Sequence, residues 1–340
     1  MPAMPDELSA ALSAALSAAL SALLAPYGED DLARDAQAIS ARYRDRVGEG
    51  ARLLTTRREA AAYAASRMPA TYAAISRALS LTLPCLPGFA PLRLTDVGAG
   101  PGTAALAAAA ACPTLAQVLC LEREAAMRDV GLALMRALPA PLSGAAYREA
   151  DLSRDQALPE AELVTACYVL GELAPRAMDA LLLRLWEAAR GLLLLVEPGT
   201  PAGAAHLLRA RALLLPLGAH IAAPCPADGP CPHAKKDGGA GEDWCHFAVR
   251  VQRTRLHRVL KGGDAPFEDE KFSFLALSRF EPVRAGARVL RHPEVHGGHI
   301  ALTLCTGAGL SRRVVTKKDK PAFRAARDAG TGSPFEPAGQ

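Results

Sequence analysis

The 340-residue sequence predicts an α/β fold built on a doubly wound, mainly parallel sheet. Short apolar segments alternate with helical segments through the middle of the chain. A glycine-rich loop links the first of these strands to a helix, and the second strand ends in an acid. The pattern predicts four regions: a helical region at 1–88, the sheet core at 89–220, a cysteine-bearing basic extension that completes the fold at 221–328, and a disordered tail at 329–340.

The N-terminal region is rich in alanine and leucine, which are strong helix formers. Helices are predicted at 8–24, 30–43 and 55–79, and Pro69 is expected to kink or split the last of them. Apolar residues of this last helix recur at roughly helical spacing, which fits core packing, or a helical lid or RNA-facing subdomain. They are Tyr63, Met68, Tyr72 and Ile75.

Strands are predicted at 92–97, 117–122, 163–168 and 192–196, and helical segments separate them. After a stretch rich in Pro, Gly and Cys at 222–241, further strands are expected at 247–256, 271–278 and 301–305. No run of 18 or more apolar residues occurs, so no membrane span is expected. The first residues lack the basic start of a secretory signal, and we therefore expect a cytoplasmic protein.

The most specific motif is the run DVGAGPG at residues 96–102, between the first strand and its helix. Gly98, Gly100 and Gly102 allow a ligand to approach the backbone closely, and the helix start offers free N–H groups. Glu122, which ends the next strand, can accept hydrogen bonds from the ribose hydroxyls of an adenosine. With Asp96 at its start, the motif resembles a class I S-adenosylmethionine-dependent methyltransferase, a Rossmann-like α/β fold. A nicotinamide cofactor and an empty, vestigial site are the alternatives.

Two more residues are candidates for this donor site. Asp151 falls where such methyltransferases place an acid near the adenine amino group, although a solvated loop acid is an equal alternative. Tyr168 follows the predicted strand at 163–168, where these enzymes place groups that face the substrate. The Asn/Asp-Pro-Pro-Tyr signature is absent, and no Pro-Cys pair stands at the end of this strand, so the catalytic residues are unknown. Methyl transfer can nevertheless proceed largely by positioning the donor and the acceptor.

Four cysteines of the extension are candidate metal ligands: Cys225, Cys231, Cys245 and Cys305. In a reducing compartment, gathered thiolates usually hold a metal or an iron–sulfur cluster rather than forming disulfides. The tight C-x2–4-C knuckles of zinc sites are missing, and irregular spacing with Cys-Pro steps better suits a [4Fe–4S] cluster. Zinc, with His233 and His246 as possible further ligands, and no metal at all are the alternatives.

Positive charge is concentrated in the second half of the chain. Residues 246–320 hold 15 Lys and Arg against 7 Asp and Glu, whereas the whole chain carries a net charge of only +4. Such a stretch can bind phosphate backbones, and surface salt bridges are the alternative. The candidate RNA-binding residues are Arg250, Arg253, Arg255, Arg258, Lys317 and Lys318. Alternation along a strand would put Arg253 and Arg255 on one face.

Five stretches together resemble the Rsm-type family of methyltransferase-like proteins of the small ribosomal subunit. They are residues 96–103, 168–173, 196–203, 225–246 and 267–274, and the resemblance covers roughly residues 30–328. It implies S-adenosylmethionine binding, contact with small-subunit rRNA during assembly or translation, and a [4Fe–4S] cluster on the four cysteines named above. A monomer without membrane contact is expected.

Three functions remain open from the sequence. The first is an rRNA methyltransferase with a structural cluster. The second is a non-catalytic assembly factor that retains the methyl-donor pocket, which the missing catalytic signature favours. The third is a small-molecule methyltransferase with a zinc site, and it predicts no salt-dependent affinity for RNA.

Overall fold

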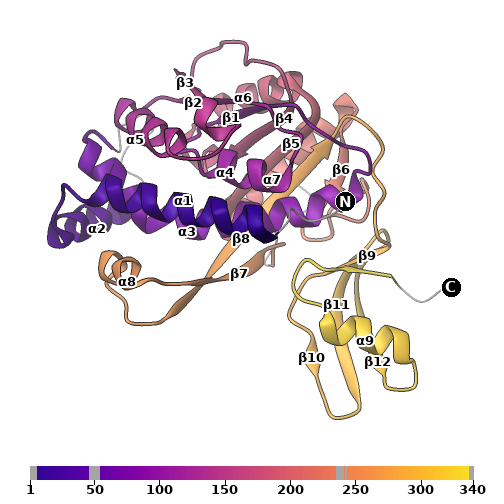
Figure 1. Ribbon diagram of the computed structural model, residues 1–340. Coiled ribbons are helices and arrows are strands. Elements are labelled where there is room, and N and C mark those ends of the chain that lie inside the picture. Colours follow the sequence, from indigo (N-terminus) through magenta and orange to yellow (C-terminus); the bar gives the residue numbers. More distant parts are fainter. Residues whose placement is uncertain (1–5, 46–53, 235–240, 242, 337–340) are drawn as a thin grey trace.

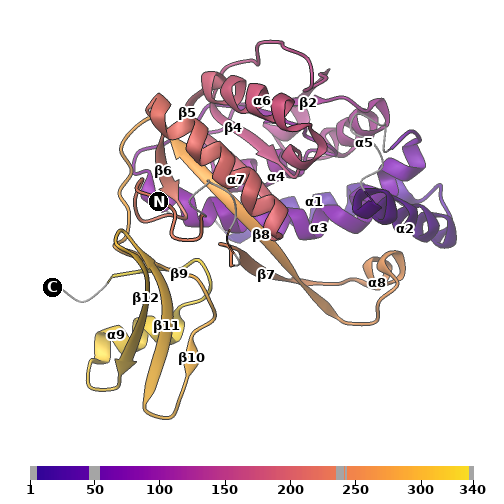
Figure 2. The same ribbon diagram turned by 180° about the vertical axis from the view of Figure 1, so that it is seen from behind.

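A computed structural model describes residues 6–45, 54–234, 241 and 243–336 of the chain. Two sheets organise it. A mixed eight-stranded sheet carries helices on both faces, and a small five-stranded sheet lies beside it near the C-terminal end, as Figure 1 and Figure 2 show from opposite sides. No helix in this described part is both long and apolar enough to cross a bilayer.

The large sheet follows the order β3-β2-β1-β4-β5-β8-β6, and β7 pairs with β8 at one end. Strands β1 to β5 pair in parallel, whereas β8 runs antiparallel to β5, β6 and β7. The predicted α/β class is confirmed, with a mixed sheet. The strands are β1 (Arg93–Val97), β2 (Gln117–Glu122), β3 (Ala146–Glu149), β4 (Ala161–Cys167), β5 (Ala189–Pro198), β6 (His220–Ala223), β7 (Phe247–Gln252) and β8 (Phe267–Ser278).

The central strands are apolar on both sides because helices cover both faces of the sheet. In β5, Leu192 and Leu194 pack with the N-terminal helices, and Leu193 and Leu195 pack on the opposite face. Helices α1 to α5 cover the first face, and α6 and α7 cover the second. They are α1 (Asp6–Leu24), α2 (Glu29–Asp45), α3 (Arg57–Thr82), α4 (Thr103–Ala111), α5 (Ala125–Arg136), α6 (Pro175–Ala188) and α7 (Pro201–Leu214).

Helix α3 runs for 26 residues and is not split at Pro69, so that part of the sequence prediction is wrong. A capping box begins the helix: the Thr56 hydroxyl accepts from the Glu59 N–H at 3.2 Å, and the Glu59 carboxylate accepts from the Thr56 N–H at 3.1 Å. The helix packs against α2, α4 and the strands β7 and β8. This packing offsets the hydrogen bond that the proline removes.

The extension divides into two parts. Strand β7, helix α8 (Arg255–Lys261) and the first half of β8 form an arm beyond the large sheet, with α8 packed against α2 (Figure 1). The second half of β8 inserts between β5 and β6. Strands β6, β7 and β8 therefore belong to the large sheet, whereas the sequence analysis assigned the whole of 221–328 to the completion of the fold.

The remaining residues form a separate C-terminal unit, which the sequence analysis did not anticipate. Its elements are β9 (Ala287–Val289), β10 (Glu294–Val295), β11 (His299–Thr306), β12 (Gly309–Thr316), α9 (Lys320–Asp328) and β13 (Pro334–Phe335). Phe335 is 3% exposed and packs with Val289 and Leu302 in the core of this unit. The predicted disordered tail is thus wrong for 329–336, because β13 pairs with β9, and 337–340 lie outside the described residues.

Candidate functional site

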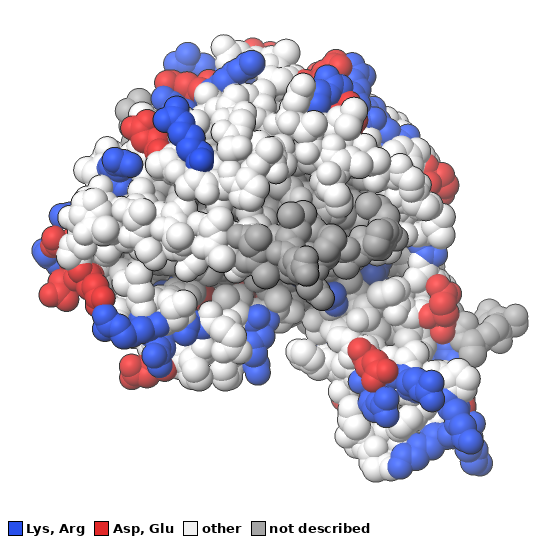
Figure 3. Space-filling model, in the orientation of Figure 1, with Lys and Arg blue, Asp and Glu red and all other residues white. Residues whose placement is uncertain are grey.

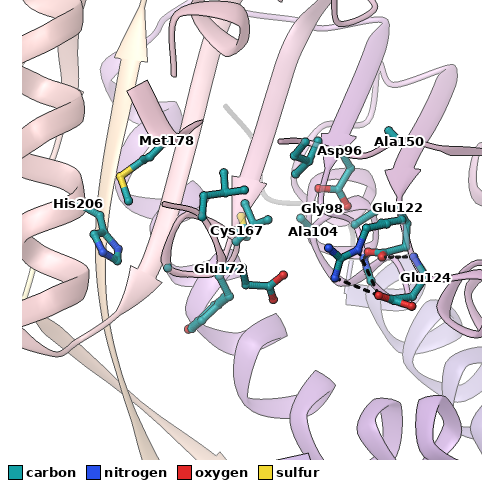
Figure 4. A pocket seen from close by; sticks show the side chains of 18 of the residues that line it. Asp96, Gly98, Ala104, Glu122, Glu124, Ala150, Cys167, Glu172, Met178 and His206 are labelled. Carbon is teal, nitrogen blue, oxygen red and sulfur yellow. Dashed lines mark hydrogen bonds and ion pairs between the residues drawn. The ribbon is translucent and has the colours of Figure 1, made fainter. Parts of the chain in front are cut away.

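A cavity of about 1030 Å³ opens at the carboxyl ends of β1, β2 and β4. The glycine loop, the ends of these strands, the loop after β3 and the helices α3, α6 and α7 supply its walls (Figure 4). Ligands of parallel α/β sheets bind at this edge. Tyr63, Met68, Tyr72 and Ile75 of α3 all pack in or against the core, and Tyr63 and Ile75 line the cavity as well.

The three loop glycines have left-handed backbones, with φ of +70° at Gly98, +54° at Gly100 and +89° at Gly102. A Cβ on Gly102 would lie 2.1 Å from Met135 Cε, so this glycine is required for packing and does not line the cavity. A Cβ on Gly100 would meet no atom within 4 Å, and Gly100 does line the cavity. The motif therefore combines two roles, one in packing and one in access to a ligand.

Glu122 points into the cavity from the end of β2 (Figure 4). Its two carboxylate oxygens accept backbone N–H bonds from Gly100 and Glu124, both at 2.8 Å. Burial raises the pKa of Glu122, and these backbone bonds oppose the rise. The strand end and the glycine loop thus hold the predicted ribose acceptor in one fixed orientation.

Asp96 is 1% exposed and lies beside Thr165 in the pairing of β1 with β4. The Thr165 hydroxyl donates to its Oδ1 at 2.7 Å, while Oδ2 has no hydrogen-bond partner in the described part of the chain. Burial raises the pKa of Asp96 to about 7. A buried carboxyl oxygen that reaches a cavity without a partner can accept a hydrogen bond from a ligand.

Tyr168 and Asp151, the two further candidates for the donor site, also line the cavity. Tyr168 has a φ of +59°, which is rare for a residue other than glycine and is found preferentially at functional sites. Burial raises its pKa well above the usual value, and its hydroxyl donates to Glu270 at 3.3 Å. Asp151 is partly exposed, and it accepts from the Ser153 hydroxyl at 2.6 Å and from the Ser153 N–H at 3.0 Å.

The sequence analysis missed the pair of Glu197 and His206, which lies across the cavity from Glu122. Glu197 ends β5 and accepts from the Leu170 N–H at 3.1 Å, while its other oxygen lies 3.1 Å from Nδ1 of His206. His206 lines the cavity from α7 (Figure 4). A single histidine in a helical segment gives no signal in a sequence. Glu197 lies within residues 196–203, which contribute to the family resemblance but predict no site by themselves.

All four predicted cysteines line one smaller cavity between the large sheet and the C-terminal unit. Cys225 and Cys231 follow β6, Cys245 precedes β7, and Cys305 lies on β11. Enclosure raises the pKa of Cys225 to about 12 and also raises the pKa of Cys245 and Cys305. His233 lines this cavity too, and His246 does not.

The metal itself is not shown. Among the described residues, no group of three or more His, Cys, Asp or Glu is arranged to hold a metal ion. The structure therefore brings the four predicted ligands to one cavity and establishes neither an iron–sulfur cluster nor zinc.

Three of the predicted RNA-binding arginines are engaged in ion pairs on the arm. Arg250 contacts Asp269 at 2.8 Å, Arg253 contacts Glu268 at 2.6 Å, and Arg255 pairs with an acid of α2. Because β7 ends before Arg253 and α8 begins at Arg255, these two residues do not share a strand face, and that expectation is wrong.

The other three predicted residues are free of acidic partners within the described ranges. Arg258 is half-buried on α8, and Lys317 and Lys318 are exposed between β12 and α9. Lys and Arg side chains gather on the C-terminal unit in Figure 3. Lys317 and Lys318 are therefore better placed than the arm arginines to meet a phosphate backbone.

The sequence profile of a protein family described as "Mitochondrial small ribosomal subunit Rsm22" matches residues 57–336. The chain belongs to this Rsm22 family. It is 28% identical over 295 residues to the human "Ribosome assembly protein METTL17, mitochondrial", covering 79% of this chain and 61% of the human protein. It is 26% identical to the "Rsm22-cox11 tandem protein 2, mitochondrial" of Schizosaccharomyces pombe, covering 90% of this chain and 46% of that protein.

The family resemblance seen in the sequence is thus confirmed, and this Rsm22-family chain spans about half to three-fifths of the length of these relatives. The expected cytoplasmic location is contradicted, because the family and these relatives are all described as mitochondrial. Among solved structures, magnesium protoporphyrin IX methyltransferase from Synechocystis PCC 6803 is 15% identical, with 71% of this chain and 90% of that chain covered and a TM-score of 0.40. A likeness at that TM-score carries no argument about function.

Proposed function

We propose that this chain binds S-adenosylmethionine in the large cavity and acts on the small ribosomal subunit during its assembly. The observation that carries the proposal is Glu122, held by Gly100 and Glu124 at the end of β2 and facing a cavity that a glycine loop keeps open. The family and the human relative, whose name is that of a ribosome assembly protein, support the ribosomal part.

The residues of the cavity fit the chemistry of this donor. Glu122 would accept from the ribose hydroxyls, and Asp151 lies at the partly exposed rim where the adenine amino group is expected. Asp96 and Glu172 add further carboxyl groups to the wall. Arg42, Arg123 and Arg209 line the cavity as well. The wall therefore offers carboxyl groups for the ammonium and sulfonium groups of the donor and arginines for its carboxylate. When bound, the donor supplies an electrophilic methyl group, and these residues hold and orient it.

Whether a methyl group is transferred is a separate question, and two versions of the proposal differ on it. In the first, the chain is an rRNA methyltransferase. In the second, it is an assembly factor whose donor pocket stabilises the fold without transfer. The cavity extends beyond the donor residues to Tyr168 and His206, which leaves room for an acceptor and favours the first.

The four cysteines would hold a [4Fe–4S] cluster, and zinc is the alternative. The fit rests on the donor set: four thiols on three separate segments reach one enclosed cavity, which Arg211 and Arg288 also line. Two buried cations beside four thiolates offset the negative charge of a metal–thiolate group. Such a group would fasten the C-terminal unit, through Cys305, to the loops that follow β6 and precede β7. The exposed lysines of that unit would then be held ready to contact rRNA, with the protein acting as a monomer.

Two measurements test the proposal. Calorimetric titration with S-adenosylmethionine should give saturable binding, and absence of binding overturns the donor site. Incubation with tritium-labelled donor and immature small subunits then separates the two versions, because transfer to rRNA supports an enzyme, and binding without transfer supports an assembly factor. A chain that binds RNA without any dependence on salt, or not at all, would favour a small-molecule enzyme instead.

The metal is tested on protein purified without oxygen. About four irons and four sulfides per chain support the cluster. One zinc per chain without sulfide supports the zinc alternative. If neither iron nor zinc is found, both proposed metal groups are refuted.

A further inference from the structure

Arg211, in the last turn of α7, is a buried arginine whose guanidinium is only partly satisfied. Arg211 is 7% exposed. Nη2 donates to the carbonyl oxygens of Asp228 (3.1 Å) and Gly229, in the loop between Cys225 and Cys231. Nη1 has no hydrogen-bond partner among the residues that the structure describes.

The buried Nη1 of Arg211 would be stabilised by an anionic hydrogen-bond acceptor. Arginine stays charged and has only donors, so a buried N–H without an acceptor lowers the stability of the fold. Arg211 lines the cavity of the four cysteines.

The other cation of the cavity, Arg288, is held by different partners. Arg288 is 3% exposed, and it donates from Nε to the Pro224 carbonyl at 2.8 Å and from Nη1 to the Gly332 carbonyl at 3.0 Å. Its hydrogen bonds join the loop before Cys225 to the last turn of the C-terminal unit. Arg211 differs from Arg288 in that its nitrogen without a partner, Nη1, is fully buried, so an acceptor for it has to lie inside the protein.

We propose that Arg211 is the counter-charge and hydrogen-bond donor of the metal–thiolate group, donating from Nη1 to one of its sulfur atoms. This inference rests on the proposed function, since it requires a metal group on the four cysteines. Arg211 is a positioning residue and not a ligand. Its Nη2 orders the loop that carries two of the ligands, and its positive charge would offset part of the negative charge of a bound metal–thiolate group.

The test uses three variants of the full chain, purified without oxygen: Arg211→Gln, Arg211→Lys and the matched control Arg284→Gln. Arg284 contacts the same loop through Asp228, with 2.6 Å between Nη1 and Oδ1, but it does not line the cavity. Loss of Arg284 therefore loosens the loop without changing the charge of the cavity. Iron, zinc and sulfide content, the midpoint potential and the rate of bleaching in air are measured for each.

The expected result is a more negative potential and roughly tenfold faster bleaching in Arg211→Gln, as for other residues that hydrogen-bond metal ligands. Arg211→Lys should lie between this variant and the wild type, and Arg284→Gln should match the wild type. The inference is overturned if Arg211→Gln keeps the wild-type potential and bleaching rate, or if Arg284→Gln shifts both to the same extent.

A second measurement decides the matter if Arg211→Gln does not fold. Wild-type protein labelled with nitrogen-15 arginine should show hyperfine coupling between an arginine nitrogen and the reduced cluster, and absence of coupling overturns the inference. Wild-type protein without any metal refutes the proposed metal group itself and the role of Arg211 with it. If zinc is found instead, the iron–sulfur part of the proposed function fails alone. Arg211 is then judged by transfer of zinc to a chelator, which should be roughly tenfold faster in Arg211→Gln.

Discussion

Two alanine substitutions in the glycine loop, Gly102→Ala and Gly100→Ala, should have different effects. The first should mainly lower the stability of the fold, and the second should mainly lower the affinity for S-adenosylmethionine. Gly102→Ala puts a Cβ 2.1 Å from Met135 Cε and 2.7 Å from the Tyr147 hydroxyl at a φ of +89°. The left-handed backbone costs about 1–2 kcal/mol, and overpacking adds about 1–3 kcal/mol. We expect the free energy of unfolding to fall by about 2–5 kcal/mol.

Gly100→Ala meets no atom within 4 Å, so it should cost only the backbone part, about 1–2 kcal/mol of unfolding free energy. Its methyl group would stand in the donor cavity beside the Glu122 bond, and we expect at least a tenfold loss of affinity for S-adenosylmethionine, about 1.4 kcal/mol. Where Gly102→Ala still folds, its affinity should stay within about twofold of the wild type, because Gly102 does not line the cavity.

Urea unfolding gives the two stabilities, and calorimetric titration gives the two affinities. The reasoning is refuted if Gly100→Ala destabilises the fold as much as Gly102→Ala. It is refuted equally if Gly100→Ala binds the donor like the wild type.

Four further predictions follow from the site. Glu122→Gln has one acceptor oxygen fewer, so it should lose one of the backbone bonds from Gly100 and Glu124. Its donor affinity should fall about tenfold or more by calorimetry, and unchanged affinity contradicts the ribose assignment. Because the raised pKa of Asp96 makes the folded form bind the proton more tightly, stability should fall as pH rises from about 4 to about 7. Asp96→Asn should be more stable than the wild type near pH 8 and similar near pH 4, and parallel pH profiles in urea unfolding would exclude this. Cys231→Ser should lose iron, and its C-terminal half should become less stable. The control Cys85→Ser, which lies away from the cavity, should keep its iron. A full iron content in Cys231→Ser refutes Cys231 as a ligand. The double change Lys317→Ala and Lys318→Ala should reduce the dependence of RNA affinity on salt, measured as the slope of log K against log salt concentration, by about 2. Arg250→Ala should leave this slope unchanged, because Asp269 already pairs with the arginine. If filter binding shows that only Arg250→Ala changes the slope, the RNA contacts the arm instead.

The sequence predicted the features that have a local cause. The strand, glycine loop and helix at residues 92–111, and the acid at 122, are adjacent in the chain and follow from backbone requirements and hydrophobic pattern. The four cysteines were grouped as candidate ligands from the sequence, and the structure brings them to one cavity.

Features that depend on distant segments were missed. His206 became a candidate only when β5 and α7 were placed beside the end of β4. Arg253 and Arg255 were misplaced because the arm turns into α8 at Thr254, whose side chain caps the helix. The strand at 334–335 is two residues long and exists through its pairing with β9, so no pattern in a Gly- and Pro-rich tail could indicate it.

The position of β8 sets the order in which the chain can be completed as it leaves the ribosome. Strand β8 is made after β6, yet it lies between β5 and β6. Until residue 278 has emerged, the apolar edge of β5 has no neighbour on that side, and β6 has nothing to pair with. Exposed strand edges of this kind slow folding and promote aggregation. We therefore expect nascent chains that end between β6 and β8 to depend on chaperones, and chains released before β8 to be degraded.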